Sequence, residues 1–120
     1  MPWLLRDGEV LAAVEEARTA VARGRGLLGR DHEGVLLLEA WSIHTIGMRR
    51  DIDVAFCRAC SVGPRHRRPD GVLELEVVGV RTLRPRRVSR PRRRGRFVLE
   101  AAAGSFASWG VAPGERLVVR

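Results

Sequence analysis

Apolar residues in this chain lie in short segments separated by turn-forming residues, and this pattern limits the folds that the chain can adopt. Within residues 72–80, leucine and valine alternate with Glu74 and Glu76, so one face of an extended strand is apolar and the other is charged. Apolar runs such as residues 35–38 are far shorter than the ~20 residues of a membrane-spanning helix. The pattern predicts a mainly β protein built from many short strands.

Turn signals and apolar segments together outline the expected sheet. The pair Asp7-Gly8, which lies between apolar residues 3–5 and 10–13, indicates a β-hairpin. Pro113-Gly114 suits the two central positions of a type II turn. Further strands are expected at residues 35–38, 43–46, 52–56, 72–80, 97–99 and 117–119. Residues 57–70 contain glycine and proline without a clear period, so we expect a loop there.

Two short helices are expected among these strands. Residues 15–23 are alanine-rich, begin with two glutamates that suit the positive end of a helix, and precede Gly24. Residues 101–109 also have a helical composition and precede Gly110, and Phe106 and Trp109 would share their buried face. The predicted fold class is α+β and mainly β: a small barrel-like sheet, antiparallel or mixed, with two short helices.

The size of the chain fits one folded unit. It has 120 residues, 45% of them hydrophobic, and no internal repeat or linker divides it, so residues 1–120 are expected to form one domain with one core. The first residues show neither a long apolar run nor a small-residue cleavage site, so no signal peptide is predicted. Two cysteines are too few for a disulfide framework. We expect reduced thiols in a cytoplasmic protein that does not enter a membrane.

The net charge of +8 comes from one part of the chain, residues 81–96, which we call the arginine-rich segment. It contains nine arginines and no acidic residue, whereas the other 13 arginines are balanced by 14 acidic residues. All 22 basic residues are arginine, and lysine, asparagine, glutamine and tyrosine are absent, which is typical of the GC-rich genome of a high-GC bacterium. Pro85, Pro91 and Gly95 predict that the segment runs extended along a sheet edge or over the surface.

The arginine-rich segment has two interpretations. Arginine contacts phosphate bidentately, so the segment would bind nucleic acid or another polyanion weakly and without sequence preference. The residues that would make these contacts are Arg84, Arg86, Arg87, Arg90, Arg92, Arg93, Arg94 and Arg96. However, the segment has no aromatic residue on which bases would stack. The other interpretation is a solvated edge, because arginine prevents edge-to-edge aggregation of sheets much as lysine does.

A polar group consists of His44, Thr45, Met48, Arg49 and Asp53. If residues 43–46 pair with 52–56, His44 and Asp53 lie nearly opposite, and the carboxylate would hold one imidazole tautomer. Arg49 would then be available to an anionic ligand, which predicts a small ligand-binding site at a barrel mouth. The alternative is a structural hydrogen bond that stabilises a tight connection between the strands. No Gly-x-Ser-x-Gly motif accompanies this group, and no residue is predicted to be catalytic.

The cysteines Cys57 and Cys60 have the spacing of half a zinc knuckle. His44, His66 or Asp70 would have to complete the site, since no second pair of ligands occurs at regular spacing. The interpretation we favour is two incidental thiols at a strand end. We therefore predict no metal and no cofactor.

Three stretches resemble a known family in their order and spacing. They are ARGRGLLGR (residues 22–30), SIHTIGMRRDIDVAF (residues 42–56) and FVLEAAAGSFASWGVAPGERLVV (residues 97–119). Together they resemble the domain-of-unknown-function family 192, in the form of its actinobacterial branch, over about residues 17–119. The resemblance implies a β-rich, barrel-like domain with short helices and implies no established reaction.

Three functional hypotheses follow. The first is a non-enzymatic binding or accessory protein that holds a small molecule or a protein partner near His44 and Asp53. The second is nonspecific binding of nucleic acid or another polyanion through the arginine-rich segment. The third and weakest is a hydrolase-type enzyme that uses His44 and Asp53. The sequence identifies neither the ligand nor the oligomeric state.

Overall fold

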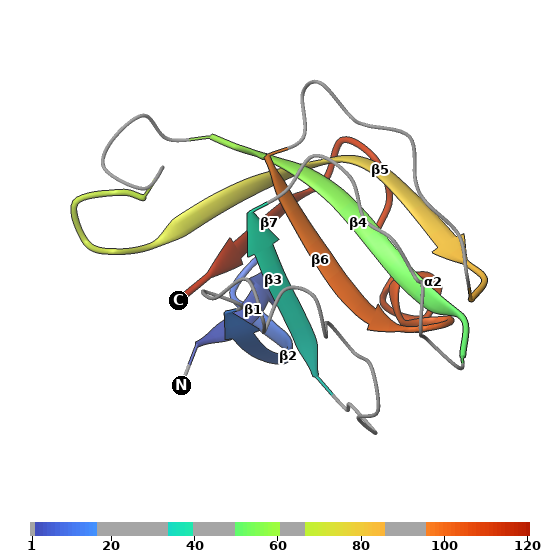
Figure 1. Ribbon diagram of the computed structural model, residues 1–120. Coiled ribbons are helices and arrows are strands. Elements are labelled where there is room, and N and C mark those ends of the chain that lie inside the picture. The colour runs from blue at the N-terminus through green and yellow to red at the C-terminus, as the bar shows by residue number, and fades with distance from the viewer. Residues whose placement is uncertain (1, 17–33, 40–49, 61–66, 86–95) are drawn as a thin grey trace.

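The computed structural model describes residues 2–16, 34–39, 50–60, 67–85 and 96–120 of the chain. Seven strands form a closed barrel in the order β1-β2-β3-β6-β4-β5-β7 (Figure 1). They are β1 (Trp3–Arg6), β2 (Glu9–Glu16), β3 (Val35–Glu39), β4 (Ile52–Ala59), β5 (Leu73–Leu83), β6 (Phe97–Ala102) and β7 (Arg116–Val119). The expected mainly β, barrel-like fold is confirmed. Within the described residues, however, there is one short helix, α2 (Ser105–Trp109), and not two.

The first hairpin forms as predicted. Asp7 and Gly8 have φ angles of 52° and 80°, and Arg6 pairs with Glu9 across the turn. A two-residue turn with both φ angles positive matches the right-handed twist of the strands that it joins.

The helix predicted at residues 15–23 is wrong at its start. Glu15 and Glu16 belong to β2, and they pair in parallel with Leu36 and Leu37 of β3. The local preference for helix is overridden because these two residues continue the strand that pairs with β1 up to Ala13 and then pair with β3. Residues 17–23 lie outside the described residues, as does the strand predicted at 43–46.

The remaining predicted strands are present, and three of them continue three residues past their predicted ends, including β6, which continues past Leu99 to Ala102. β5 continues three residues past Val80, and β4 continues three residues past Phe56. The prediction of a loop from Cys57 is therefore wrong for residues 57–59, which pair with β5. Pairing with β5 imposes strand geometry on all three residues, and β6 also pairs with Cys57, although the local sequence lacks a clear period. A β-bulge between Phe56 and Cys57 lets the long strand bend around the barrel.

Apolar side chains pack on both faces of the sheet. The interior contains Leu4, Val14, Val35, Leu37, Ala55, Cys57, Leu73, Leu75, Val77, Leu99, Leu117 and Val119, among others. The outer face of β3, β6, β4 and β5 carries a second buried group, namely Leu36, Leu38, Ile52, Val54, Phe56, Leu83 and Val98. Residues paired side by side share a face, so β3, β4 and β6 are largely buried on both sides, whereas β5 carries Glu74, Glu76 and exposed Arg81 on its outer face.

Helix α2 is shorter than predicted. Ala101 and Ala102 extend β6, and the helix begins only at Ser105. Phe106 and Trp109 do share its buried face, with ring centroids 5.7 Å apart in an edge-to-face arrangement. Figure 1 shows α2 next to the end of β6 and the beginning of β4, where Phe106 packs into the interior.

The predicted turn at Pro113-Gly114 is confirmed. The N–H of Glu115 donates to the carbonyl of Ala112 (3.2 Å), and Gly114 has a φ of 93°. The turn leads into β7, which closes the barrel between β5 and β1. In the described part of the chain, no helix is long and apolar enough to cross a membrane.

Candidate functional site

The structure describes one member of the predicted polar group. Asp53 lies on β4, whereas His44, Thr45, Met48 and Arg49 fall outside the described residues. The predicted pairing of His44 with Asp53, and a ligand site built on it, therefore stay predictions.

Asp53 is almost fully buried, with 3% of its surface exposed, and both carboxylate oxygens accept hydrogen bonds. Oδ1 accepts from the hydroxyl of Thr82 on β5 (2.6 Å). Oδ2 accepts from the backbone N–H groups of Gly104 (3.0 Å) and Phe106 (3.2 Å). The carboxylate thus ties β4 to β5 and to the start of α2.

These bonds replace a cap that α2 lacks. Its N-cap residue is Gly104, which has no side chain to accept from the first N–H groups of the helix. A negative charge is also favourable at the positive end of a helix. Asp53 therefore holds Phe106 against the barrel interior, a structural role that differs from the predicted bond across the connection between residues 43–46 and 52–56. Sequence reasoning missed Thr82, Gly104 and Phe106 as its partners.

A second buried carboxylate was not singled out from the sequence. Glu100 on β6 is 2% exposed and pairs with Leu36 and Val54, so it shares the outer apolar face of the sheet. The available signal was a charged residue directly after the strand predicted at residues 97–99. The carboxylate has an interacting partner in the structure.

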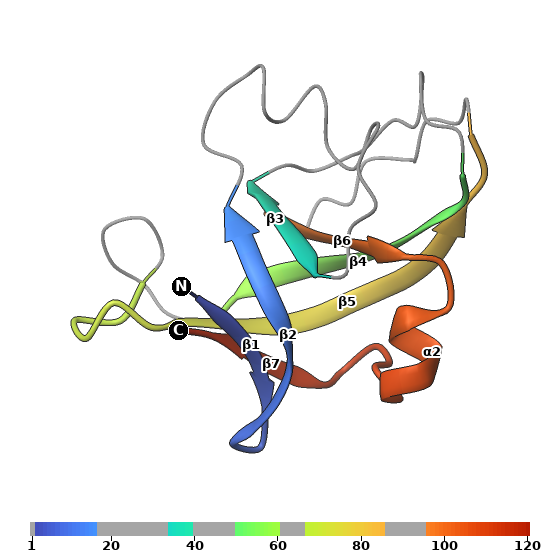
Figure 2. The ribbon, with the colours of Figure 1, turned by 90° about the horizontal axis from the view of Figure 1, so that it is seen from below.

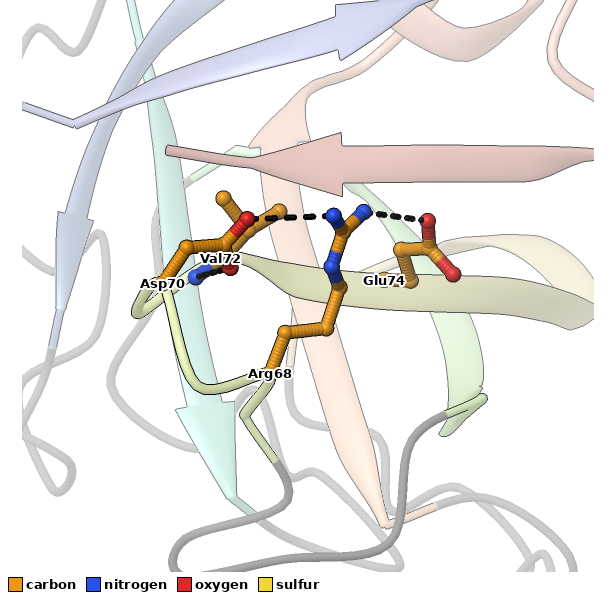
Figure 3. A network of polar contacts seen from close by, with 4 residues as sticks. All are labelled: Arg68, Asp70, Val72 and Glu74. Atoms are coloured by element: carbon orange, nitrogen blue, oxygen red, sulfur yellow. Dashed lines mark hydrogen bonds and ion pairs between the residues drawn. The ribbon is translucent and has the colours of Figure 1, made fainter.

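Most described arginines away from the arginine-rich segment are ion-paired within the chain. Arg68 bonds to Asp70 and Glu74 (3.0 Å each), and Asp70 also accepts from the N–H of Val72 (Figure 3). Further pairs join Arg67 to Glu16, Arg58 to Glu76 (2.6 Å) and Arg6 to Glu115 (3.3 Å). These positive charges are locally compensated, which reduces their attraction for an outside anion.

The arginine-rich segment is described only at its ends. Arg81, Arg84 and Arg96 are exposed, whereas Arg86, Arg87, Arg90, Arg92, Arg93 and Arg94 lie outside the described residues. Arg81 is in β5, so the segment begins as an extended strand, as predicted. No ion pair of Arg81 occurs in the part of the chain that the structure describes.

In the described part of the chain, the C-terminal half of β5 has a neighbouring strand on only one side. β7 pairs with residues 73–76 of β5, and the described chain places no strand beside residues 78–83 on that side. Figure 2 shows β5 extending well beyond the stretch that lies next to β7. The predicted edge location therefore holds for Arg81.

Of the residues predicted as possible zinc ligands, the structure describes Cys57, Cys60 and Asp70, whereas His44 and His66 lie outside the described residues. Cys57 is buried in the core, and its thiol lies 3.7 Å from the carbonyl oxygen of Ala55. Burial raises the pKa of the Cys57 thiol to about 12, with a smaller contribution from Cys60, so the thiolate that zinc requires is disfavoured. Among the described residues, no cluster of three histidine, cysteine or acidic side chains could hold a metal.

Two solved structures share this fold. One is a "putative transcription regulator" from Sinorhizobium meliloti 1021, with a TM-score of 0.68 and 20% identity over 97% of this chain and 89% of its own. The other, a protein of unknown function from Novosphingobium aromaticivorans DSM 12444, has a TM-score of 0.67 and 15% identity over 97% of this chain and 81% of its own. At these identities the likeness establishes the fold alone.

Comparison of the sequence with family models and with curated proteins found no relative. No family model matches the chain, and neither does any curated protein. The resemblance to family 192 therefore stays a prediction.

Proposed function

We propose that this chain is a non-catalytic binding domain for an anionic partner, which it contacts at the arginine-bearing end of β5. The observation that carries the proposal is the contrast between arginines. Arg58, Arg67 and Arg68 are paired with acidic residues, whereas Arg81 is exposed, has no described ion pair and begins a segment without any acidic residue. Uncompensated positive charge attracts anions.

The geometry of Asp53 argues against a catalytic site built on this carboxylate. A general base must reach the proton that it abstracts. Asp53 is buried, and its oxygens already accept from Thr82, Gly104 and Phe106. A binding role at the end of β5 does not require a ligand to reach the carboxylate of Asp53.

Nucleic acid is one anionic partner to be tested. A protein of similar fold is described as a "putative transcription regulator", although that likeness concerns the fold. The described arginine-bearing strand carries no aromatic residue between 78 and 85 for base stacking.

The experiment is a fluorescence polarisation titration with labelled duplex DNA, single-stranded DNA and polyglutamate at about 50 mM and about 200 mM salt. We expect at least one anion to bind at the lower concentration and to weaken at the higher one. The variant Arg81→Glu should weaken binding, whereas Arg116→Glu should change it much less, because Arg116 is exposed but lies directly opposite Glu76 on the neighbouring strand. If no anion binds at low salt, the proposed function is wrong.

A further inference from the structure

Among the described residues, the backbone of β5 is paired on both sides only as far as Val77. The N–H of Val77 donates to the carbonyl of Glu115 (2.8 Å), and its carbonyl accepts from the N–H of Gly114 (2.8 Å). Beyond Val77 the strand continues to Leu83 with β4 as its partner on one side. We call residues 78–83 the free edge of β5.

The directions of the side chains show which backbone N–H and C=O groups of the free edge point away from β4. In an extended strand, side chains and backbone polar groups alternate together, so residues that share a face direct their N–H and C=O groups to the same side. Val77 faces the interior and directs both groups away from β4. Val80 also packs against the interior, and Thr82 reaches Asp53 there, so both direct their backbone groups away from β4.

Neither Val80 nor Thr82 has a backbone partner on that side among the described residues. Each therefore offers one donor and one acceptor, at the spacing with which a strand pairs. Thr82 is exposed, so a partner can approach this edge from solvent.

We propose that the free edge of β5 binds an extended acidic peptide as an added strand. The proposal rests on the proposed function and names the partner class. Arg81 lies between Val80 and Thr82, is exposed and has no described ion pair, and exposed Arg84 follows the strand. Backbone pairing would provide affinity, and alternate acidic side chains beside Arg81 would provide specificity.

Charge excludes a second copy of the same edge as the favoured occupant. If two copies paired through residues 78–83 about a two-fold axis, Arg81 and Arg84 of one would lie near the same residues of the other. Like charges across neighbouring strands are destabilising. Arginine at this edge thus opposes self-pairing while it attracts an acidic strand.

A peptide also fits better than nucleic acid. Phosphate oxygens can accept from the N–H groups of Val80 and Thr82 but offer no donor to their carbonyls. A peptide backbone supplies both donors and acceptors.

The test uses a fluorescent peptide of alternating glutamate and valine, titrated against the full chain by polarisation. Two further peptides carry N-methyl groups, one on every valine and the other on every glutamate. Because alternate N–H groups of a strand point to opposite sides, only one version blocks the pairing side. We expect that version to bind about tenfold or more weakly, a loss of about 1.4 kcal/mol, and the other to bind as the unmodified peptide does. A loss confined to the valine version indicates antiparallel addition, and a loss confined to the glutamate version indicates parallel addition.

The variants separate this inference from the proposed function. Arg81→Glu should weaken peptide binding about tenfold or more, whereas Arg116→Glu should leave it nearly unchanged. If the peptide binds but both methylated versions bind equally well, strand addition is wrong and anionic binding stands. If duplex DNA binds and the peptide does not, nucleic acid replaces peptide as the partner. If neither the peptide nor any polyanion binds, both proposals fail.

Discussion

The role of Asp53 as a cap for α2 can be tested by replacing it with asparagine and alanine. Asparagine keeps the shape and can still accept from Gly104 and Phe106 while its amide nitrogen donates to Thr82, so the main loss is the charge. Hydrogen bonds to a charged group contribute about 1 kcal/mol more than neutral ones. With both oxygens of Asp53 engaged, Asp53→Asn should cost about 2 kcal/mol.

Alanine removes the acceptor altogether. The N–H of buried Phe106 then loses its partner, and Asp53→Ala should cost about 4 kcal/mol, a large part of the stability of a small domain. The free energy of unfolding would be measured by urea denaturation followed by circular dichroism. Hydrogen exchange of the Phe106 amide should become faster in both variants, because α2 would open locally.

A matched control lies two residues away. Asp51 is exposed and directly precedes β4, so Asp51→Asn should change the free energy of unfolding by less than about 0.5 kcal/mol. In a double-mutant cycle, Asp53→Asn and Thr82→Val should be coupled by about 1 kcal/mol, because the two side chains share a hydrogen bond. If Asp53→Asn is as mild as Asp51→Asn and leaves exchange at Phe106 unchanged, the capping argument is refuted.

Three other predictions concern the core, a turn and the thiols. Phe106→Ala should lower the free energy of unfolding by about 3–5 kcal/mol in denaturant titrations, because a fully buried ring leaves a cavity. Gly114→Ala should lower the free energy of unfolding by about 1 kcal/mol in the same assay. A Cβ at this position would meet nothing within 4 Å, so the cost comes from the φ of 93°, which is strained for an L residue. Pro113→Ala should have a smaller effect. With a thiol reagent at pH 8, Cys57 should react only after unfolding, because burial raises its pKa to about 12; reaction of native Cys57 as fast as Cys60 would contradict this. The free energy of unfolding should also fall as the pH rises from about 9 toward 12, because in this range the thiol is ionised in the unfolded chain and still protonated in the folded one.

Local features of the fold were predictable because they depend on neighbouring residues. The φ angles at Asp7 and Gly8 and the turn at Pro113-Gly114 follow from the residue types at those positions. The alternation in residues 73–77 likewise predicted which side chains of β5 face the interior. Each of these features depends on a few consecutive residues, so it can be predicted without knowing the rest of the fold.

Errors arose where distant pairing overrides local preference. The alanine- and glutamate-rich residues at the end of β2 are strand because β1 and β3 hold them there. Similarly, Ala101 and Ala102 lengthen β6 because they pair with Asp53 and Ile52 of β4. Helix propensity differs by less than about 1 kcal/mol per residue among ordinary residues. The free energy gained by pairing with a neighbouring strand exceeds this difference.

The candidate sites divide in the same way. Asp53 was recognised as a special polar residue, but its partners lie 29, 51 and 53 residues away in sequence, so its role as a helix cap could not be predicted. The compensation of Arg67 by Glu16, 51 residues away, was equally hidden, and with it the contrast between the paired arginines and Arg81.

The sequence by itself determined that this is a mainly β chain with one strongly basic segment, because residue order sets both strand period and local charge. Only the tertiary structure decided which arginines are compensated, which carboxylate caps the helix and where a strand edge has no partner among the described residues. The physical reason is that these properties depend on pairs of groups brought together by strand order, and closure of the barrel brings β7 beside only the first part of β5.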